Sequence, residues 1–179
     1  NNIPIHYLSP SKWVYDKVKN SITHPKSTIR ILNNAVDVQH FSPLDKRKIE
    51  IKNKIQNSIK IVTSAVGFKF NPYKDLDTII RAFKSLNNYI NDREIKLVVI
   101  GEKKDNYQGL NLQNIRFIDP VFNTKDLIKY YREGDIFVHS ANIETWGFTV
   151  TEALSLGLPV IASNVGGIKD QIKGYKIPD

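Results

Sequence analysis

Two glutamates separated by seven residues, Glu144 and Glu152, have the types and spacing most suited to chemistry in this chain. Carboxylates accept strong hydrogen bonds, which suits them to the hydroxyl groups of a sugar. Between them, Gly147 lets a ligand approach the backbone, and the N–H groups of the helical turn at 148–150 form a site for an anion such as a diphosphate. Judged by spacing alone, the simpler interpretation is that Glu152 caps or solvates a helix and Glu144 lies on the surface.

Two lysines, Lys69 and Lys74, lie five residues apart in a second polar segment, 67–75. Cations there could neutralise a diphosphate, including the charge that develops on a leaving group. The net charge of +8, from 26 Lys and Arg against 18 Asp and Glu, favours anionic partners. A lysine-rich surface also keeps a protein soluble, so each lysine taken singly is equally explained as a solvated loop residue.

The elements that must position these residues alternate between apolar strands and amphipathic helices. Strands are expected at 59–66, 95–100, 115–118, 136–139 and 159–163, and helices at 76–89, 124–133 (capped by Thr124), 147–156 and 168–172. This alternation predicts an α/β fold: a Rossmann-like parallel sheet with helices on both faces and strand order 3-2-1-4-5. Ligands of such sheets bind at the carboxyl ends of the strands, at the switch point between the first and fourth strands. The loops 67–74 and 140–148 therefore meet there, which favours a binding role for the glutamates.

The sequence lacks the residues that several other classes of functional site require. The chain has no cysteine, which excludes disulfides, thiolate metal sites and cysteine nucleophiles. His139 and Asp135, at the two ends of one predicted strand, do not have the spacing of metal ligands, and a strand-end histidine is often a packed or capping residue. The Gly-x-Ser-x-Gly elbow, the Walker loop and the Gly-x-Gly-x-x-Gly fingerprint are absent. No apolar run approaches the roughly 18 residues that cross a bilayer, and no signal peptide opens the chain.

The carboxyl-terminal third carries a recognisable combination of motifs. The run 144–163 joins the Glu-x7-Glu pair to Gly157-Leu158-Pro159-Val160, and Gly166-Gly167 follows. This combination closely resembles the donor-site signature of retaining GT-B glycosyltransferases of family 4, the glycosyl transferases group 1. The segments 33–37 and 41–43 resemble the family's interdomain linker, and 9–11 resembles the end of its acceptor domain.

The resemblance implies a domain organisation. Residues 1–43 would be the remnant of an acceptor domain and the interdomain linker, with short strands at 5–8 and 29–32 and a helix at 11–21. Residues 44–179 would be the nucleotide-sugar-binding domain, the carboxyl-terminal half of a GT-B fold truncated at its end, with a surface helix or linker at 44–57. The rest of the acceptor domain would be missing, so the fragment would bind donor but transfer poorly.

The resemblance also implies roles for individual residues. Glu144 would contact the donor sugar near the reacting centre, together with Lys74 as a catalytic residue, and Glu152 would bind the nucleotide ribose. Backbone groups at Gly147, Phe148 and Thr149 would hold sugar hydroxyls and phosphate. Lys69 and Lys74 fall where the family carries an Arg and a Lys that grip the diphosphate.

This sequence departs from the family pattern near the expected phosphate site. Lys69 stands where the family has an arginine. A lysine cannot donate the two parallel hydrogen bonds that a guanidinium gives to a phosphate. Asp75 replaces a glycine and places a negative charge beside the lysines. Ala35 replaces the linker glycine.

The function implied is that of a metal-independent transferase without a cofactor. It would take a sugar from a UDP- or GDP-sugar to a glycan or lipid-linked acceptor, with retention, in the cytoplasm or at the inner face of the membrane as a peripheral protein. Alternatives are a sugar-nucleotide epimerase or phosphorylase of the same fold, and a non-catalytic nucleotide-binding module. Nucleic acid is not an expected partner, because the aromatic residues Trp146 and Phe148 lie in the donor motif and Phe83 lies on a core face.

Overall fold

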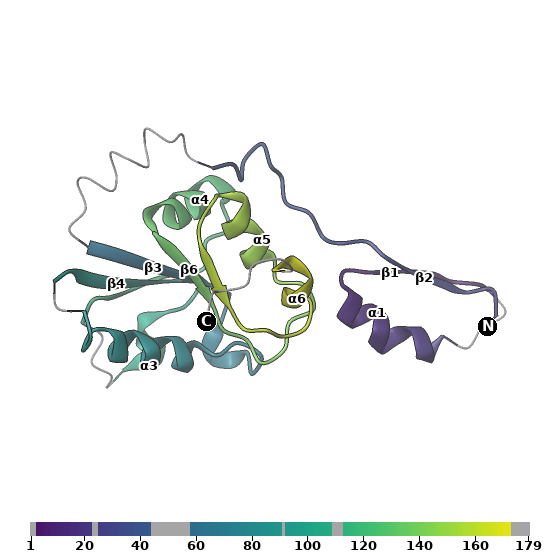
Figure 1. The fold of residues 1–179 in the computed structure, drawn as a ribbon, viewed down its shortest axis with the longest axis horizontal. Helices are drawn as coiled ribbons and strands as arrows, with labels where there is room; N and C mark the ends of the chain where they lie inside the picture. Colours follow the sequence, from purple (N-terminus) through teal and green to yellow (C-terminus); the bar gives the residue numbers. More distant parts are fainter. Residues whose placement is uncertain (1–2, 23–24, 44–57, 91, 109–112, 173–179) are drawn as a thin grey trace.

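A five-stranded parallel sheet forms the core of the larger lobe of the molecule (Figure 1). The computed structural model describes residues 3–22, 25–43, 58–90, 92–108 and 113–172, so the element expected at 44–57 lies outside the described residues. The strands are β3 Ser58–Ser64, β4 Glu94–Ile100, β5 Ile115–Ile118, β6 Ile136–His139 and β7 Val160–Ala162. Their order is β5-β4-β3-β6-β7. This is the predicted order 3-2-1-4-5, because two amino-terminal strands precede β3 in the numbering.

Helices cover both faces of this sheet, as predicted. Helix α3 (Leu76–Leu86) packs on one face, and α4 (Thr124–Glu133), α5 (Phe148–Ser155) and α6 (Ile168–Gln171) lie on the other side of the sheet in Figure 1. Neighbouring residues of a strand point to opposite faces. Ile61 therefore joins the apolar cluster under α3, whereas Val62 joins the cluster under α4 and α5.

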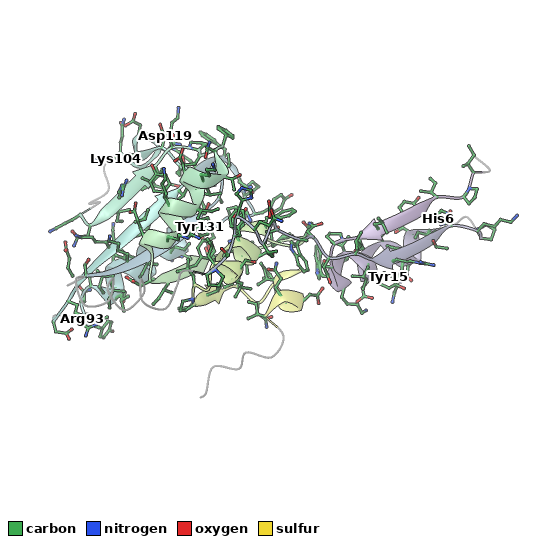
Figure 2. All side chains as sticks on the ribbon, turned by 90° about the horizontal axis from the view of Figure 1, so that it is seen from above. His6, Tyr15, Arg93, Lys104, Asp119 and Tyr131 are labelled. Carbon is green, nitrogen blue, oxygen red and sulfur yellow. The ribbon has the colours of Figure 1, made fainter. Side chains whose placement is uncertain are left out.

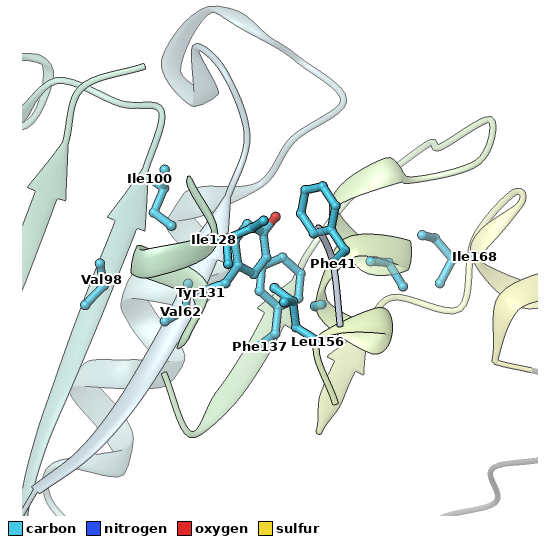
Figure 3. Close-up of a cluster of buried hydrophobic side chains, with 11 residues drawn as sticks. Phe41, Val62, Val98, Ile100, Ile128, Tyr131, Phe137, Leu156 and Ile168 are labelled. Carbon is cyan, nitrogen blue, oxygen red and sulfur yellow. The ribbon is translucent and has the colours of Figure 1, made fainter. Parts of the chain in front are cut away.

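The cluster under α4 and α5 is built around two stacked aromatic rings (Figure 3). Tyr131 of α4 and Phe137 of β6 have ring centroids 5.3 Å apart and are fully buried. Phe41, from the segment before the domain, packs into the same cluster. The buried face of the domain therefore includes residues contributed by the amino-terminal part of the chain.

Several helix and strand ends differ from the sequence prediction by one to three residues, among them the N-cap of α4 and the end of α3. The N-cap of α4 is Asn123 rather than Thr124, because the Asn123 side chain accepts hydrogen bonds from the N–H groups of Lys125 and Asp126. Helix α3 ends at Leu86 instead of residue 89. Gly157 ends α5 as a left-handed glycine cap, with φ +78°.

The amino-terminal segment forms a small separate layer. Strands β1 (His6–Ser9) and β2 (Thr28–Ile31) pair in parallel, joined by α1 (Lys12–Val18) and the 3₁₀ turn η1 (Lys19–Ser21). An extended segment then leads to the main sheet, and the two parts lie at opposite ends of the molecule in Figure 2. No helix among the described residues is long and apolar enough to cross a membrane.

Candidate functional site

The loops after β3 and β6 meet at the carboxyl edge of the sheet, as the strand order predicts. The N–H of Asp75 donates to the Ser140 carbonyl at 3.3 Å, and the N–H of Asn142 donates to the Tyr73 carbonyl at 3.0 Å. Lys74 pairs with Ala141 in an isolated antiparallel bridge between these bonds. The two loops thus form one hydrogen-bonded unit at the switch point.

Glu144 lies inside this unit, paired with Lys74. The Lys74 ammonium donates to Oε2 of Glu144, and the two side chains are only 16% and 14% exposed. The other carboxylate oxygen, Oε1, accepts from the N–H of Thr145 at 3.1 Å. The simpler interpretation, a solvated surface glutamate, is therefore wrong for Glu144.

The backbone of Glu144 is held by the Gly166-Gly167 turn. The N–H of Gly167 donates to the Glu144 carbonyl at 2.9 Å. Gly166 has φ +49°, and a Cβ built on it would lie 1.8 Å from the Glu144 carbonyl oxygen. Glycine at 166 is thus required by both conformation and space, which explains why this turn accompanies the glutamate in the sequence.

Burial and ionic contacts act in opposite directions on Glu144. Burial raises the pKa of its carboxyl group, but His139 and Lys74 favour the ionised form and together lower that pKa to about 2. Glu144 is therefore a carboxylate at neutral pH. A partly buried anion held beside a cation can accept hydrogen bonds from a ligand's hydroxyl groups without first losing a proton.

His139 is a neighbour of this carboxylate that the sequence did not identify as functional. It ends β6, is 2% exposed, and its Nε2 lies 3.7 Å from Oε2 of Glu144. Its Nδ1 is 3.4 Å from the Thr149 hydroxyl of α5. The only sequence signal was its place at the carboxyl end of the strand that precedes the Glu144 loop.

Glu152 lies farther along α5, against the buried Tyr131. The Tyr131 hydroxyl donates to Oε2 of Glu152 at 2.8 Å. Burial raises the pKa of Glu152, and the bond from Tyr131 offsets part of that rise. Glu152 neither caps α5 nor is a solvated side chain, so the simpler interpretation is wrong here as well.

The start of α5 lacks a side-chain cap. Its N-cap is Gly147, with φ +91°. The N–H groups of Val150 and Thr151 donate to the Gly147 carbonyl at 3.1 and 3.2 Å. The expectation that the whole turn 148–150 offers N–H groups to an anion is therefore wrong at Val150, and only Phe148 and Thr149 retain that role.

Lys69 lies in the 3₁₀ turn η2 (Phe68–Phe70) and contacts the loop after β4. Its N–H donates to Oε2 of the buried Glu102 at 2.8 Å, and its ammonium donates to the Asn106 carbonyl at 2.9 Å. Asn106 lies in the 3₁₀ turn η3 (Lys104–Tyr107). Lys69 and Lys74 both line one pocket of about 370 Å³ between these loops.

Asp75 uses its charge within α3 and not toward the lysines. It is the N-cap of α3, and its carboxylate accepts from the N–H of Thr78 at 2.9 Å and from the Thr78 hydroxyl at 2.6 Å. These bonds, the hydroxyl bond first, lower the pKa of Asp75. The aspartate that replaces the family's glycine thus has a local structural role.

We expect Asp75→Ala to lower the free energy of unfolding by about 1 kcal/mol, because it removes an N-cap. Asp75→Asn should keep most of that stability, since asparagine caps helices as well as aspartate does. Urea denaturation of the two variants beside Asn123→Ala, which removes the cap of α4, checks the assignment. An equal loss in Asp75→Asn would show that the charge itself matters.

No group of three or more His, Cys, Asp or Glu in the described part of the chain could hold a metal ion. The site consists instead of a lysine-paired carboxylate, a second carboxylate and an uncapped helix start. These groups are suited to a ligand with both hydroxyl and phosphate groups.

Comparison with known proteins gives the family. A model of the glycosyl transferases group 1 matches residues 45–177. The chain belongs to this family. D-inositol 3-phosphate glycosyltransferase of Corynebacterium glutamicum (strain R) is 28% identical over 153 residues, which cover 78% of this chain and 36% of the relative. GDP-mannose-dependent alpha-mannosyltransferase of Mycobacterium tuberculosis is 29% identical over 141 residues, covering 79% and 35%. The chain thus spans about a third of the length of these relatives.

Solved structures of group 1 type and related transferases share the fold of this chain. Sucrose-phosphate synthase from Thermosynechococcus elongatus superposes with a TM-score of 0.70 at 17% identity, over 93% of this chain and 42% of that protein. WaaG, a glycosyltransferase involved in lipopolysaccharide biosynthesis, gives 0.67 at 22% identity, over 93% and 46%. The parallel α/β architecture is that of GT-B glycosyltransferases.

Proposed function

We propose that this chain binds the nucleoside-diphosphate sugar of a retaining glycosyltransferase of family 4. The observation that carries the proposal is the convergence of Lys74, Glu144 and the uncapped start of α5 at the switch point. Among the structural relatives, the Anabaena protein HepE was solved with UDP and glucose, at a TM-score of 0.69 and 16% identity over 93% of this chain and 46% of that protein. The Mycobacterium tuberculosis relative is named for its dependence on GDP-mannose.

In the proposed complex each group meets one part of the donor. The diphosphate lies at the N–H groups of Phe148 and Thr149, where the helix dipole favours negative charge. Lys74 and Lys69 neutralise the charge that develops as the nucleoside diphosphate leaves. Glu144 accepts hydrogen bonds from the sugar hydroxyls. Glu152 accepts hydrogen bonds from the ribose, with Tyr131 orienting it from behind.

Retention in this proposal does not use a protein nucleophile. The acceptor hydroxyl attacks the anomeric carbon on the face from which the diphosphate departs, and a phosphate oxygen takes the hydroxyl proton. The bond from the anomeric carbon to the phosphate oxygen breaks as the bond to the acceptor oxygen forms. The protein contributes by holding the donor and stabilising the leaving group.

We assign residues 1–43 to the acceptor side of the enzyme and 44–179 to the donor domain. A parallel pair of strands such as β1 and β2 normally belongs to a larger sheet covered on both faces. Leu8 of β1 is 66% exposed and Leu32, just after β2, is 60% exposed. A glycan or lipid-linked acceptor would bind on that side of the enzyme.

Titration calorimetry with UDP, GDP, UDP-glucose and GDP-mannose tests the proposal. We expect one nucleotide series to bind saturably and Glu152→Ala to weaken it about tenfold, the loss of one charged hydrogen bond. Glu94→Ala is the matched control, because Glu94 begins β4 at the opposite edge of the sheet and pairs with Lys96. A folded protein that binds neither series, or equal weakening by both variants, would contradict the proposal.

A further inference from the structure

His139 has an unsatisfied nitrogen beside the functional carboxylate. The residue is 2% exposed, and its Nε2 is buried without a hydrogen-bond partner among the described residues. Most buried side-chain nitrogens in folded proteins are hydrogen-bonded, so an unpartnered ring nitrogen beside a carboxylate suggests a functional contact. The group toward which Nε2 is directed is Oε2 of Glu144, at 3.7 Å, an ion-pair distance that is too long for a hydrogen bond.

Lys74 faces two anions in the proposed function, Glu144 and the diphosphate of the donor. In the structure its ammonium donates to the same Oε2 that His139 faces. If Lys74 turns from the carboxylate to the phosphate, in line with its role in the proposed function, the carboxylate keeps only the N–H of Thr145 at 3.1 Å. A charge that is 14% exposed and loses its partner is costly. Another donor must then hold Glu144.

The His139 ring is fixed where such a donor is needed. It lies at the end of a central strand, and the Thr149 hydroxyl is 3.4 Å from its Nδ1. A hydrogen bond between Thr149 and Nδ1 orients the ring and leaves Nε2 facing Glu144. Thr149 belongs to the first turn of α5, so the ring links the helix start to the carboxylate.

We propose that His139 is a positioning residue that holds Glu144 toward the donor sugar when Lys74 passes from Glu144 to the diphosphate. In the structure Glu144 is paired with Lys74. In the bound arrangement His139 donates from Nε2 to Glu144, and the carboxylate accepts from the sugar. The inference rests on the proposed function and adds a residue to its donor site.

The test compares the protein's affinity for a nucleotide with its affinity for the corresponding nucleotide sugar. Affinities for UDP and UDP-glucose, and for GDP and GDP-mannose, are measured by calorimetry on the wild type, His139→Phe and His139→Gln. We expect His139→Phe to reduce the preference for the sugar nucleotide about tenfold, because only the sugar needs Glu144, and to leave the affinity for the diphosphate alone within about twofold. His139→Gln should retain the preference, since its amide donates from nearly the same place as Nε2.

The outcomes separate the two proposals. Binding by the wild type with an unchanged preference in His139→Phe, or an equal loss for nucleotide and sugar nucleotide, would overturn the role of His139 alone. Absence of any nucleotide binding by the folded wild type would overturn the proposed function and the role of His139 with it. If His139→Phe fails to fold, Thr149→Val removes the hydroxyl beside Nδ1 and should reduce the same preference, by a smaller factor; an unchanged preference there would also overturn the inference.

Discussion

Replacing Gly166 by alanine is expected to lower the free energy of unfolding by about 3 kcal/mol, from left-handed backbone strain and overpacking together. The new Cβ would lie 1.8 Å from the Glu144 carbonyl oxygen and 2.8 Å from its carbonyl carbon. Both are backbone atoms, so no side chain can rotate away and the Glu144 loop must move. Urea denaturation measures the loss of stability, and calorimetry should show a matching loss of nucleotide-sugar affinity.

Gly67→Ala provides the control for backbone strain. Gly67 also has a positive φ, +66°, but a Cβ there would meet no atom within 4 Å. Its replacement should therefore cost only the left-handed conformation, about 1 kcal/mol. Equal losses in the two variants would show that conformation, and not the contact with Glu144, makes Gly166 necessary.

The sheet and the meeting of the two loops could be predicted because they depend on pattern. A nearly continuous apolar run such as 95–100, interrupted only by Lys96, is typical of a strand buried on both faces, and the connections of parallel strands have one hand. These rules fix which strands are neighbours. They place the loops after β3 and β6 together without any knowledge of the side chains in them.

The contacts inside the site could not be predicted in the same way. Lys74 and Glu144 are 70 residues apart, and strand order brings their loops together without saying which side chains pair. The position of His139 at a strand end was a weak signal, because a buried strand-end histidine is usually a packing residue. Its importance comes from the unsatisfied Nε2, which only a three-dimensional structure reveals.

Asp75 shows how a local rule can resolve a departure from a family pattern. Next to the lysines, its charge looked unfavourable for phosphate. Aspartate is also among the best N-cap residues, and the helix begins at the following residue, Leu76. The sequence prediction places the cap of α4 one residue too late. Asn123 and Thr124 are both good N-cap residues, and the backbone geometry decides between them.

Glu144→Gln and Glu152→Gln are expected to change stability in opposite directions at neutral pH. The folded protein lowers the pKa of Glu144 from 4.5 to about 2, a shift that corresponds to about 3 kcal/mol. Glu144→Gln forfeits that stabilisation and leaves Lys74 without its partner. Burial, only partly offset by the Tyr131 hydroxyl, raises the pKa of Glu152, so the ionised carboxylate opposes folding. Glu152→Gln keeps an oxygen that can accept from Tyr131 and removes the charge.

The pH dependence distinguishes the two effects. A depressed pKa gives stability that is present above the unfolded value, 4.5, and is lost as pH falls toward 2. The loss of unfolding free energy in Glu144→Gln, relative to the wild type, should therefore shrink progressively below pH 4.5. A raised pKa gives stability that is present below the unfolded value and is lost as pH rises through the folded value. The gain in stability of Glu152→Gln over the wild type should therefore appear only as pH rises above about 4.5.

Urea denaturation of the wild type and both variants between pH 3 and 7 measures these differences, with Glu94→Gln as the control for an exposed glutamate at the far edge of the sheet. A stability loss in Glu152→Gln at pH 7 would contradict the assignment of Glu152 as a buried, opposed charge. If the variant is instead more stable and binds nucleotide more weakly, the carboxylate reduces stability while improving binding. A residue that lowers stability but improves binding is expected at a binding site and not at a structural one. The stability measurement therefore also tests the ribose-binding role proposed for Glu152.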